Sequence, residues 1–119
     1  MNISEKMVSL ALQGLEDKKA EDITIIDISQ VSSMADYFVI ASGNNKSQIQ
    51  TMTDSVSDKL GRAGYYTKFK EGYDNANWIL LDYQDIIVHI FDQENRNFYN
   101  LERIWSDGKK VDTTNFQYE

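Results

Sequence analysis

Residues 78–91 read Trp-Ile-Leu-Leu-Asp-Tyr-Gln-Asp-Ile-Ile-Val-His-Ile-Phe, with two apolar runs on either side of a polar break at residues 82–85. Each run is shorter than a typical helix and rich in β-branched or aromatic residues, so the stretch predicts two strands joined by a tight turn. Neither run alternates cleanly between apolar and polar residues, which favours central strands covered on both faces. The rest of the chain is expected to supply that cover.

Composition indicates one small globular domain. The chain has 119 residues, of which 41% are hydrophobic and 26% charged, as is ordinary for a globular protein. No apolar run approaches the roughly 20 residues that cross a bilayer, and the N-terminus lacks the basic flank and apolar centre of a signal peptide. Without cysteine there is no disulfide and no thiolate metal ligand. We expect a cytoplasmic protein that does not enter a membrane.

The acidic charge is unevenly distributed. The net charge is −7, and residues 1–36 and 82–102 each contribute −4. No segment carries the stripe of Lys and Arg expected of a protein that binds nucleic acid directly. The charge either keeps a small protein in solution or favours a basic partner.

Apolar residues at helical spacing predict three helices, at residues 4–18, from residues 44–45 to Gly64, and at residues 94–105. Their apolar positions are Ile3, Met7, Val8, Ala11 and Leu15, then Ile49, Met52, Val56, Leu60 and Ala63, and finally Phe98, Leu101 and Trp105. Further strands are expected at residues 23–28, 37–41 and 65–71. The predicted order is α-β-β-α-β-β-β-α.

This order predicts an α/β fold with a mixed five-stranded sheet covered by helices, in a single domain at residues 1–106. The second strand, the second helix and the third strand are expected to form a right-handed crossover with parallel strands. Residues 107–119 are polar and without periodicity, so we expect a frayed C-terminal tail.

Few residues offer catalytic chemistry. The turn from Ser42 to Asn45 lies between a strand and a helix, where backbone amides could meet an anion, or where a glycine simply permits the turn; no P-loop or dinucleotide motif is present. His89, the single histidine, lies within an apolar strand and is expected to be buried and hydrogen-bonded. An imidazole-rich zinc site is therefore excluded.

Three residues of the hairpin have more than one reading. Asp82 and Asp85 flank the turn, where they could be solvated turn residues, metal or acid–base carboxylates, or part of an acidic contact surface. Trp78 begins a strand beside a polar loop and is expected to be half covered, either as core or as an interface anchor. The same two readings apply to Trp105, where the alternative to an anchor is docking of the third helix.

Motifs spread over residues 5–106 resemble the ribosomal silencing factor family, also called Iojap or RsfS. The matching segments are residues 27–29 (Asp-Ile-Ser), 32–43 (Ser-Ser-Met-Ala-Asp-Tyr-Phe-Val-Ile-Ala-Ser-Gly), 71–72, 78–83, 85–91, Arg96, and the series Phe98, Tyr99, Leu101, Glu102, Ile104 and Trp105. The resemblance implies a nucleotidyltransferase-like fold, a homodimer and no enzymatic activity. It also implies binding to the large ribosomal subunit through its fourteenth protein, which sterically blocks joining of the small subunit.

On this basis we expect Trp78 to be an apolar anchor, Asp82 and Asp85 to be charged contacts, and Glu71 and Tyr83 to support them, with no cofactor and no metal. Two rivals remain. One is a nucleotidyltransferase-like enzyme that uses the turn from Ser42 to Asn45 and magnesium, although the strand after the second helix lacks the acidic pair such enzymes need. The other is a dimeric adaptor with a different basic client.

Two positions depart from the family pattern. Lys46 stands one place before the basic residue that relatives often have after the glycine turn. Gln84 occupies a turn position where relatives commonly have glycine. If that position needs a positive φ, Gln84 carries a strain of about 1 kcal/mol; a different turn geometry would avoid it.

Overall fold

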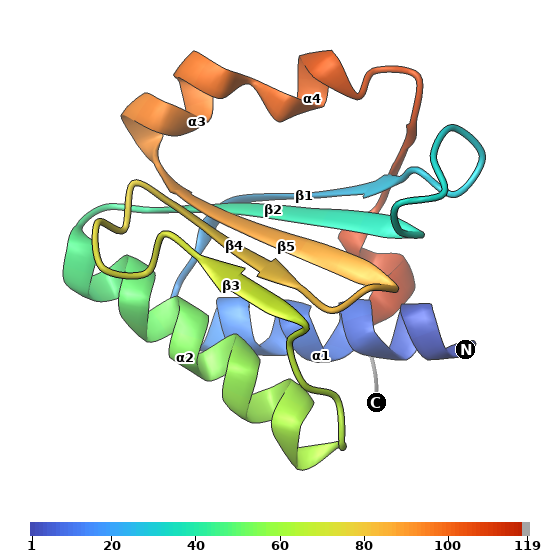
Figure 1. The fold of residues 1–119 in the computed structure, drawn as a ribbon, viewed down its shortest axis with the longest axis horizontal. Helices are drawn as coiled ribbons and strands as arrows, with labels where there is room; N and C mark the ends of the chain where they lie inside the picture. The colour runs from blue at the N-terminus through green and yellow to red at the C-terminus, as the bar shows by residue number, and fades with distance from the viewer. Residues whose placement is uncertain (118–119) are drawn as a thin grey trace.

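The computed structural model describes residues 1–117 and folds them into a six-stranded mixed sheet with helices on both faces (Figure 1). The strand order across the sheet is β3-β4-β5-β2-β1-β6. In chain order the elements are α1 (Ile3–Asp17), β1 (Glu21–Asp27), β2 (Tyr37–Gly43), α2 (Lys46–Arg62), β3 (Phe69–Glu71), β4 (Trp78–Asp82), β5 (Ile86–Asp92), α3 (Gln93–Tyr99), α4 (Leu101–Ile104), β6 (Lys109–Val111) and the 3-10 helix η1 (Thr113–Phe116).

The predicted hairpin is confirmed. Strands β4 and β5 pair antiparallel, with Ile79 opposite Ile90 and Leu80 opposite His89. β5 lies in the middle of the sheet, and its residues from 86 to 91 are all buried, as expected for a strand covered on both faces. β4 differs, because it alternates between buried and half-buried residues. The half-buried residues of β4 lie on the face of the sheet opposite α1 and α2.

Two helix layers provide the cover (Figure 1). α1 and α2 pack against each other and under one face of the sheet, while α3 contacts β5 and β2 from the other face. The predicted apolar positions of the first two helices are buried, apart from Ile3, which is exposed, and Ala63, which follows the last turn of α2. The cap of α1 is Asn2, which forms a capping box with Glu5. The expected cap, Ser4, instead donates to Asp36.

The predicted crossover between the second and third strands is wrong. β2 pairs parallel with β5, placing Val39 opposite Val88, while β3 pairs antiparallel with β4 at the sheet edge. The reason is burial. β2 needs neighbours that can be covered on both faces, and the apolar β5 meets that need, whereas all three residues of β3 are exposed.

The sheet has six strands, so the five-strand prediction is wrong, and so is the frayed tail for the described residues. β6 pairs antiparallel with β1, and η1 buries Phe116 against the ring of Tyr37, with 5.4 Å between ring centroids. A three-residue strand with two lysines has no apolar pattern to reveal it. Residues 118–119 of the predicted tail lie outside the described residues.

The single third helix is also wrong. Asn100, with a φ of 48°, breaks it into α3 and α4. Leu101 is buried and Trp105 packs edge-on against Phe38, which docks this segment on the sheet. Phe98, expected on the buried side, is 78% exposed. Across residues 1–117, no helix combines the length and apolar character needed to cross a membrane.

Candidate functional site

Strands β3 and β4 are only partly covered on the face opposite α1 and α2, where α3 reaches Trp78 through Tyr99. In β4, Ile79 and Leu81 point toward α1 and α2 and are buried, so Trp78, Leu80 and Asp82 point the opposite way. Register places Phe69 opposite Asp82 and Glu71 opposite Leu80, and paired residues share a face. Together with the adjacent ring of Tyr99, these residues form what we call the β3–β4 face: Phe69, Glu71, Trp78, Leu80, Asp82 and Tyr99.

Trp78 is half-buried, as predicted, and lies at the start of β4, at one end of the β3–β4 face. Its ring stacks on Phe91 with 5.0 Å between centroids and lies 4.6 Å from the ring of Tyr99. Its Nε1–H donates to Nδ1 of His89 across 3.1 Å. The indole is therefore held from beneath, while part of its surface stays open. This is the geometry of a fixed aromatic group that a partner could cover.

His89 is buried and hydrogen-bonded, which confirms the prediction for the single histidine. Burial lowers the pKa of His89 from 6.5 to about 3, so the ring is neutral at physiological pH. Because Nδ1 accepts a hydrogen bond, the proton lies on Nε2. Nε2 is buried and has no hydrogen-bond partner among residues 1–117. This imidazole is a buried hydrogen-bond acceptor behind Trp78.

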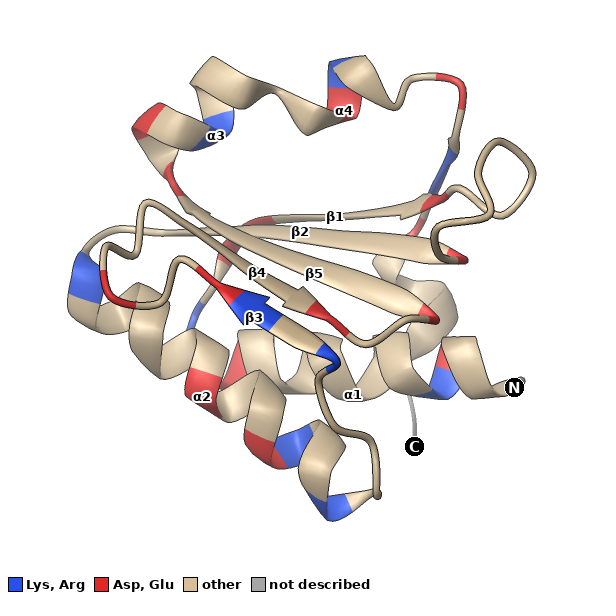
Figure 2. Cartoon of the chain, in the orientation of Figure 1, with Lys and Arg blue, Asp and Glu red and all other residues tan. Residues whose placement is uncertain are grey.

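The two carboxylates of the β3–β4 face differ in their bonding. Glu71 is exposed and, with Trp78 and Leu80, lines a hollow of about 280 Å³. Asp82 accepts the backbone N–H of Gln84 at 2.8 Å, so it also closes the hairpin turn. Acidic positions lie on β3 and at the end of β4 (Figure 2). Both carboxylates flank the apolar centre of the face.

The structure separates Asp85 and Tyr83 from Trp78. Asp85 is exposed but lines a different hollow, of about 310 Å³, together with Tyr65 and Tyr66. Tyr83 is only 4% exposed and packs in the core beneath the sheet, so its predicted role as a partner contact does not fit. Within residues 1–117 no three Asp, Glu or His side chains come together as metal ligands would.

The turn geometry at Gln84 is the strained one. Gln84 has a φ of +75°, the left-handed conformation that glycine adopts without cost. Gly72, in the loop before β4, also has a positive φ. Its φ is +84°, and a Cβ there would lie 2.1 Å from the carbonyl oxygen of Trp78. Only glycine allows this approach, which fixes the loop beside Trp78.

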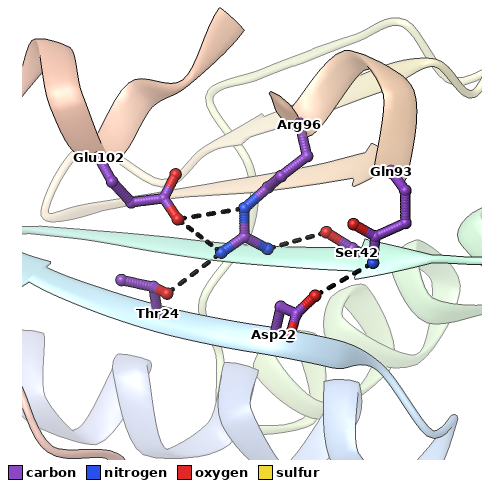
Figure 3. Close-up of polar contacts among 6 residues, drawn as sticks. All are labelled: Asp22, Thr24, Ser42, Gln93, Arg96 and Glu102. Carbon is purple, nitrogen blue, oxygen red and sulfur yellow. Dashed lines mark hydrogen bonds and ion pairs between the residues drawn. The ribbon is translucent and has the colours of Figure 1, made fainter. Parts of the chain in front are cut away.

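A second polar cluster surrounds Arg96 (Figure 3). Its guanidinium is buried and donates to Glu102 at 2.8 Å, to Ser42 Oγ at 2.8 Å and to Thr24 Oγ1 at 3.1 Å. Burial by itself would raise the pKa of Glu102, but the hydrogen bond and charge of Arg96 outweigh it and hold that pKa below its ordinary value. The cluster ties α3 and α4 to β1 and β2.

The turn from Ser42 to Asn45 is occupied by internal bonds. The Ser42 hydroxyl accepts from Arg96, the N–H of Asn44 donates to Gln48, and Asn45 caps α2. A polar hollow of about 500 Å³ adjoins this region, lined by residues that include Asp22, Arg96 and Glu102. Lys46 is the first residue of α2 and exposed. The local geometry is that of a capped helix packed beside a buried ion pair.

Sequence reasoning missed several residues of these two clusters. Phe69 and Tyr99 are 53% and 40% exposed. The alternation of residues 65–71 gave no signal for the exposure of Phe69, because alternation places an apolar residue between two lysines on the buried face. Nothing local signalled Leu80, which resembles its buried neighbours. Arg96 and Glu102 were part of the family match, but the hydrogen bonds of Arg96 to Ser42 and Thr24 join segments far apart along the chain.

The fold and the β3–β4 face define a small α/β protein with a partly covered aromatic face at one edge of its sheet. The family model described as "Ribosomal silencing factor during starvation" matches residues 2–119. The ribosomal silencing factor RsfS of Bacillus subtilis is 37% identical over 108 residues, which cover 91% of this chain and 92% of that protein. The chain therefore belongs to the ribosomal silencing factor family.

Two further comparisons agree. A crystal structure of a protein from Chromobacterium violaceum superposes with a TM-score of 0.85 at 33% identity, covering 94% of this chain and 92% of that one. A more distant relative in Mus musculus, named "Mitochondrial assembly of ribosomal large subunit protein 1", is 27% identical over 83% of this chain and 45% of its own length. The fold described above is thus the fold of this family.

Proposed function

We propose that this protein is a translation silencing factor that binds the large ribosomal subunit through its fourteenth protein and blocks association with the small subunit. The observation that carries the proposal is the β3–β4 face, with a fixed, half-buried Trp78 beside partly covered apolar residues and two carboxylates. Family membership and the names of the relatives support a ribosomal partner. We further propose that the protein acts in the cytoplasm and forms a homodimer.

The chemistry of the β3–β4 face suits a basic protein surface. Tryptophan and tyrosine are enriched among residues that dominate binding energy, particularly where surrounding groups exclude water. Glu71 and Asp82 flank this apolar centre, and carboxylates in that position would steer and orient a basic partner. Asp85, at the tip of the hairpin, would extend the acidic contact along one edge. The proposed mechanism is steric, because a protein bound at the subunit interface prevents joining without making or breaking a bond.

Co-sedimentation with isolated large subunits tests the proposal. Trp78→Ala should bind at least tenfold more weakly, the usual loss at an aromatic anchor. Ile104→Ala is the control, because Ile104 is an exposed apolar residue of α4 outside both the β3–β4 face and the hollow beside Asp85. Glu71→Lys probes charge without touching the core, and raised salt should weaken binding of the wild type. Binding of Trp78→Ala equal to that of the wild type would remove the anchor assignment.

Subunit joining is measured separately. Large subunits mixed first with the protein and then with small subunits should form fewer joined ribosomes on a sucrose gradient, and Trp78→Ala should restore them. If the wild type binds large subunits but the joined fraction is unchanged, the protein docks without silencing. That result would favour an adaptor with a ribosomal client.

The polar hollow beside Arg96 keeps one alternative open, a nucleotidyltransferase-like enzyme using the turn from Ser42 to Asn45 and magnesium. This hollow adjoins the carboxyl end of β2, where open α/β sheets commonly bind ligands. The internal bonds of Ser42 and Asn44 favour the docking function instead. Incubation with nucleotides and magnesium decides, since binding or turnover would support the enzyme.

A further inference from the structure

We propose that His89 is a positioning residue for docking, which holds the Trp78 indole in the orientation that a partner meets. This inference rests on the proposed function of the β3–β4 face. It goes further by assigning the binding competence of Trp78 to a buried residue that no partner touches.

The sheet register brings the two side chains together. His89 lies opposite Leu80 and Phe91 lies opposite Trp78, so all four side chains point to the same face. Trp78 stacks on Phe91 and reaches diagonally to His89 Nδ1, 3.1 Å from its Nε1. Stacking alone leaves the indole free to slide over Phe91 through small changes of its χ1 and χ2 angles. The hydrogen bond removes that freedom, because it fixes the direction of the N–H group.

His89 stabilises the fold less than an apolar side chain at this position would. It interrupts the apolar series of β5, and its Nε2 is buried without a partner among residues 1–117. A buried unpaired donor destabilises a fold, and an apolar side chain here would avoid that loss. The hydrogen bond that His89 makes within the described residues goes to Trp78. A group that costs stability and serves an open aromatic residue is typical of a functional site rather than of a core.

Fixing Trp78 in advance favours binding because an ordered side chain loses less entropy when a partner covers it. His89 stays neutral and accepting at physiological pH, since burial lowers its pKa to about 3. The hydrogen bond therefore holds the orientation of the indole throughout the physiological pH range. The ring of Tyr99 packs against the indole from a second direction, with 4.6 Å between centroids, and restricts it further.

Two isosteric variants separate positioning from packing. His89→Asn keeps an acceptor, because its Oδ1 stands close to where Nδ1 stands, whereas His89→Leu has the same shape without an acceptor. Large-subunit affinity of His89→Leu should fall about three- to tenfold below that of His89→Asn, as expected for one lost hydrogen bond. Thermal stability should rank the opposite way, with His89→Leu melting at a higher temperature, because the unpaired buried amide N–H groups of Asn cost more than the half-buried Trp78 N–H that Leu leaves without an acceptor.

The hydrogen bond is read directly by NMR in a Trp105→Phe background, which leaves one indole N–H signal. That signal should shift and exchange faster with solvent in His89→Leu than in the wild type, and His89→Asn should lie between them. If His89 only stabilised the fold, the more stable of the two variants would bind large subunits more tightly. The indole N–H would then exchange with solvent at the same rate in both variants. That outcome would overturn the proposal.

The outcomes also separate this inference from the proposed function. If the wild type does not co-sediment with large subunits, the proposed function fails and the docking role of His89 fails with it. If the wild type binds and Trp78→Ala does not, but His89→Leu binds like the wild type, then the face is correct and the positioning role is wrong. Weak binding by His89→Leu with recovery in His89→Asn supports both.

Discussion

Lowering the pH from 7 to 5 should destabilise this protein chiefly through one buried side chain. The pKa of His89 falls from 6.5 to about 3 on folding because the ring is buried. Between pH 7 and pH 5 the His89 imidazole therefore gains a proton in the unfolded chain but stays neutral in the folded chain. Stability is then lost progressively as the pH falls below about 6.5 and continues to fall toward pH 3.

The magnitude follows from the two pKa values. At pH 5 the unfolded imidazole, with its pKa of 6.5, is almost fully protonated while the folded one is neutral. The difference corresponds to about 2 kcal/mol of unfolding free energy between pH 7 and pH 5. The lowered pKa of Glu102 acts in the same direction, but it removes stability mainly below the ordinary carboxyl range. The interval from pH 7 to pH 5 thus isolates His89.

Urea unfolding followed by far-ultraviolet circular dichroism at the two pH values measures this change. His89→Leu is the control, because it removes the titrating group and should lose less than about 0.5 kcal/mol over the same interval. Equal pH dependence in the wild type and in His89→Leu would refute the reasoning. So would an NMR titration in which the His89 ring protonates near pH 6.5 in the folded protein.

Three substitutions test other parts of the fold by urea unfolding. Gln84→Gly should raise the unfolding free energy by about 0.5–1 kcal/mol, because it removes the strain of φ +75° but adds chain entropy to the unfolded state; a loss would contradict the turn geometry. Gly14→Ala should lower it by about 1–3 kcal/mol, since the new Cβ would lie 2.9 Å from Val56 Cα where α1 meets α2; no change would mean that the helices separate easily. Phe116→Ala should cost about 3 kcal/mol by emptying its buried site, and a cost as small as that of the exposed control Tyr66→Ala would show that η1 contributes nothing.

The central hairpin could be predicted because its signal is local. Continuous apolar runs around a polar turn specify two strands and their burial, and the structure adds only the register. The partner of β2 could not be predicted in this way. Its pairing with β5 is decided by which strand can be buried on both faces, and the short, exposed β3 cannot. Pairing between distant segments depends on such competition rather than on any local pattern.

The candidate site, like the fold, could be predicted only in part. Trp78 and Glu71 were found from the sequence and lie together at one hollow, whereas Tyr83 was chosen by its position in a motif and is buried. Alternation in β4 separates Trp78 from Ile79, but the apolar letters alone do not show which side is only partly covered. That depends on where α3 and α4 lie, and the break at Asn100 sets their course.

The order of strands in the sheet also decides when the protein can assemble during its own synthesis. One edge of β2 has no partner until β5 has been synthesised. One edge of β1 has no partner until β6, which is made later still. Trp78 gains its supports, Phe91 and Tyr99, only from the last third of the chain. A nascent chain emerging from the exit tunnel therefore carries an incomplete sheet and an unsupported indole. The surface proposed for docking is therefore completed only after Tyr99 has been made.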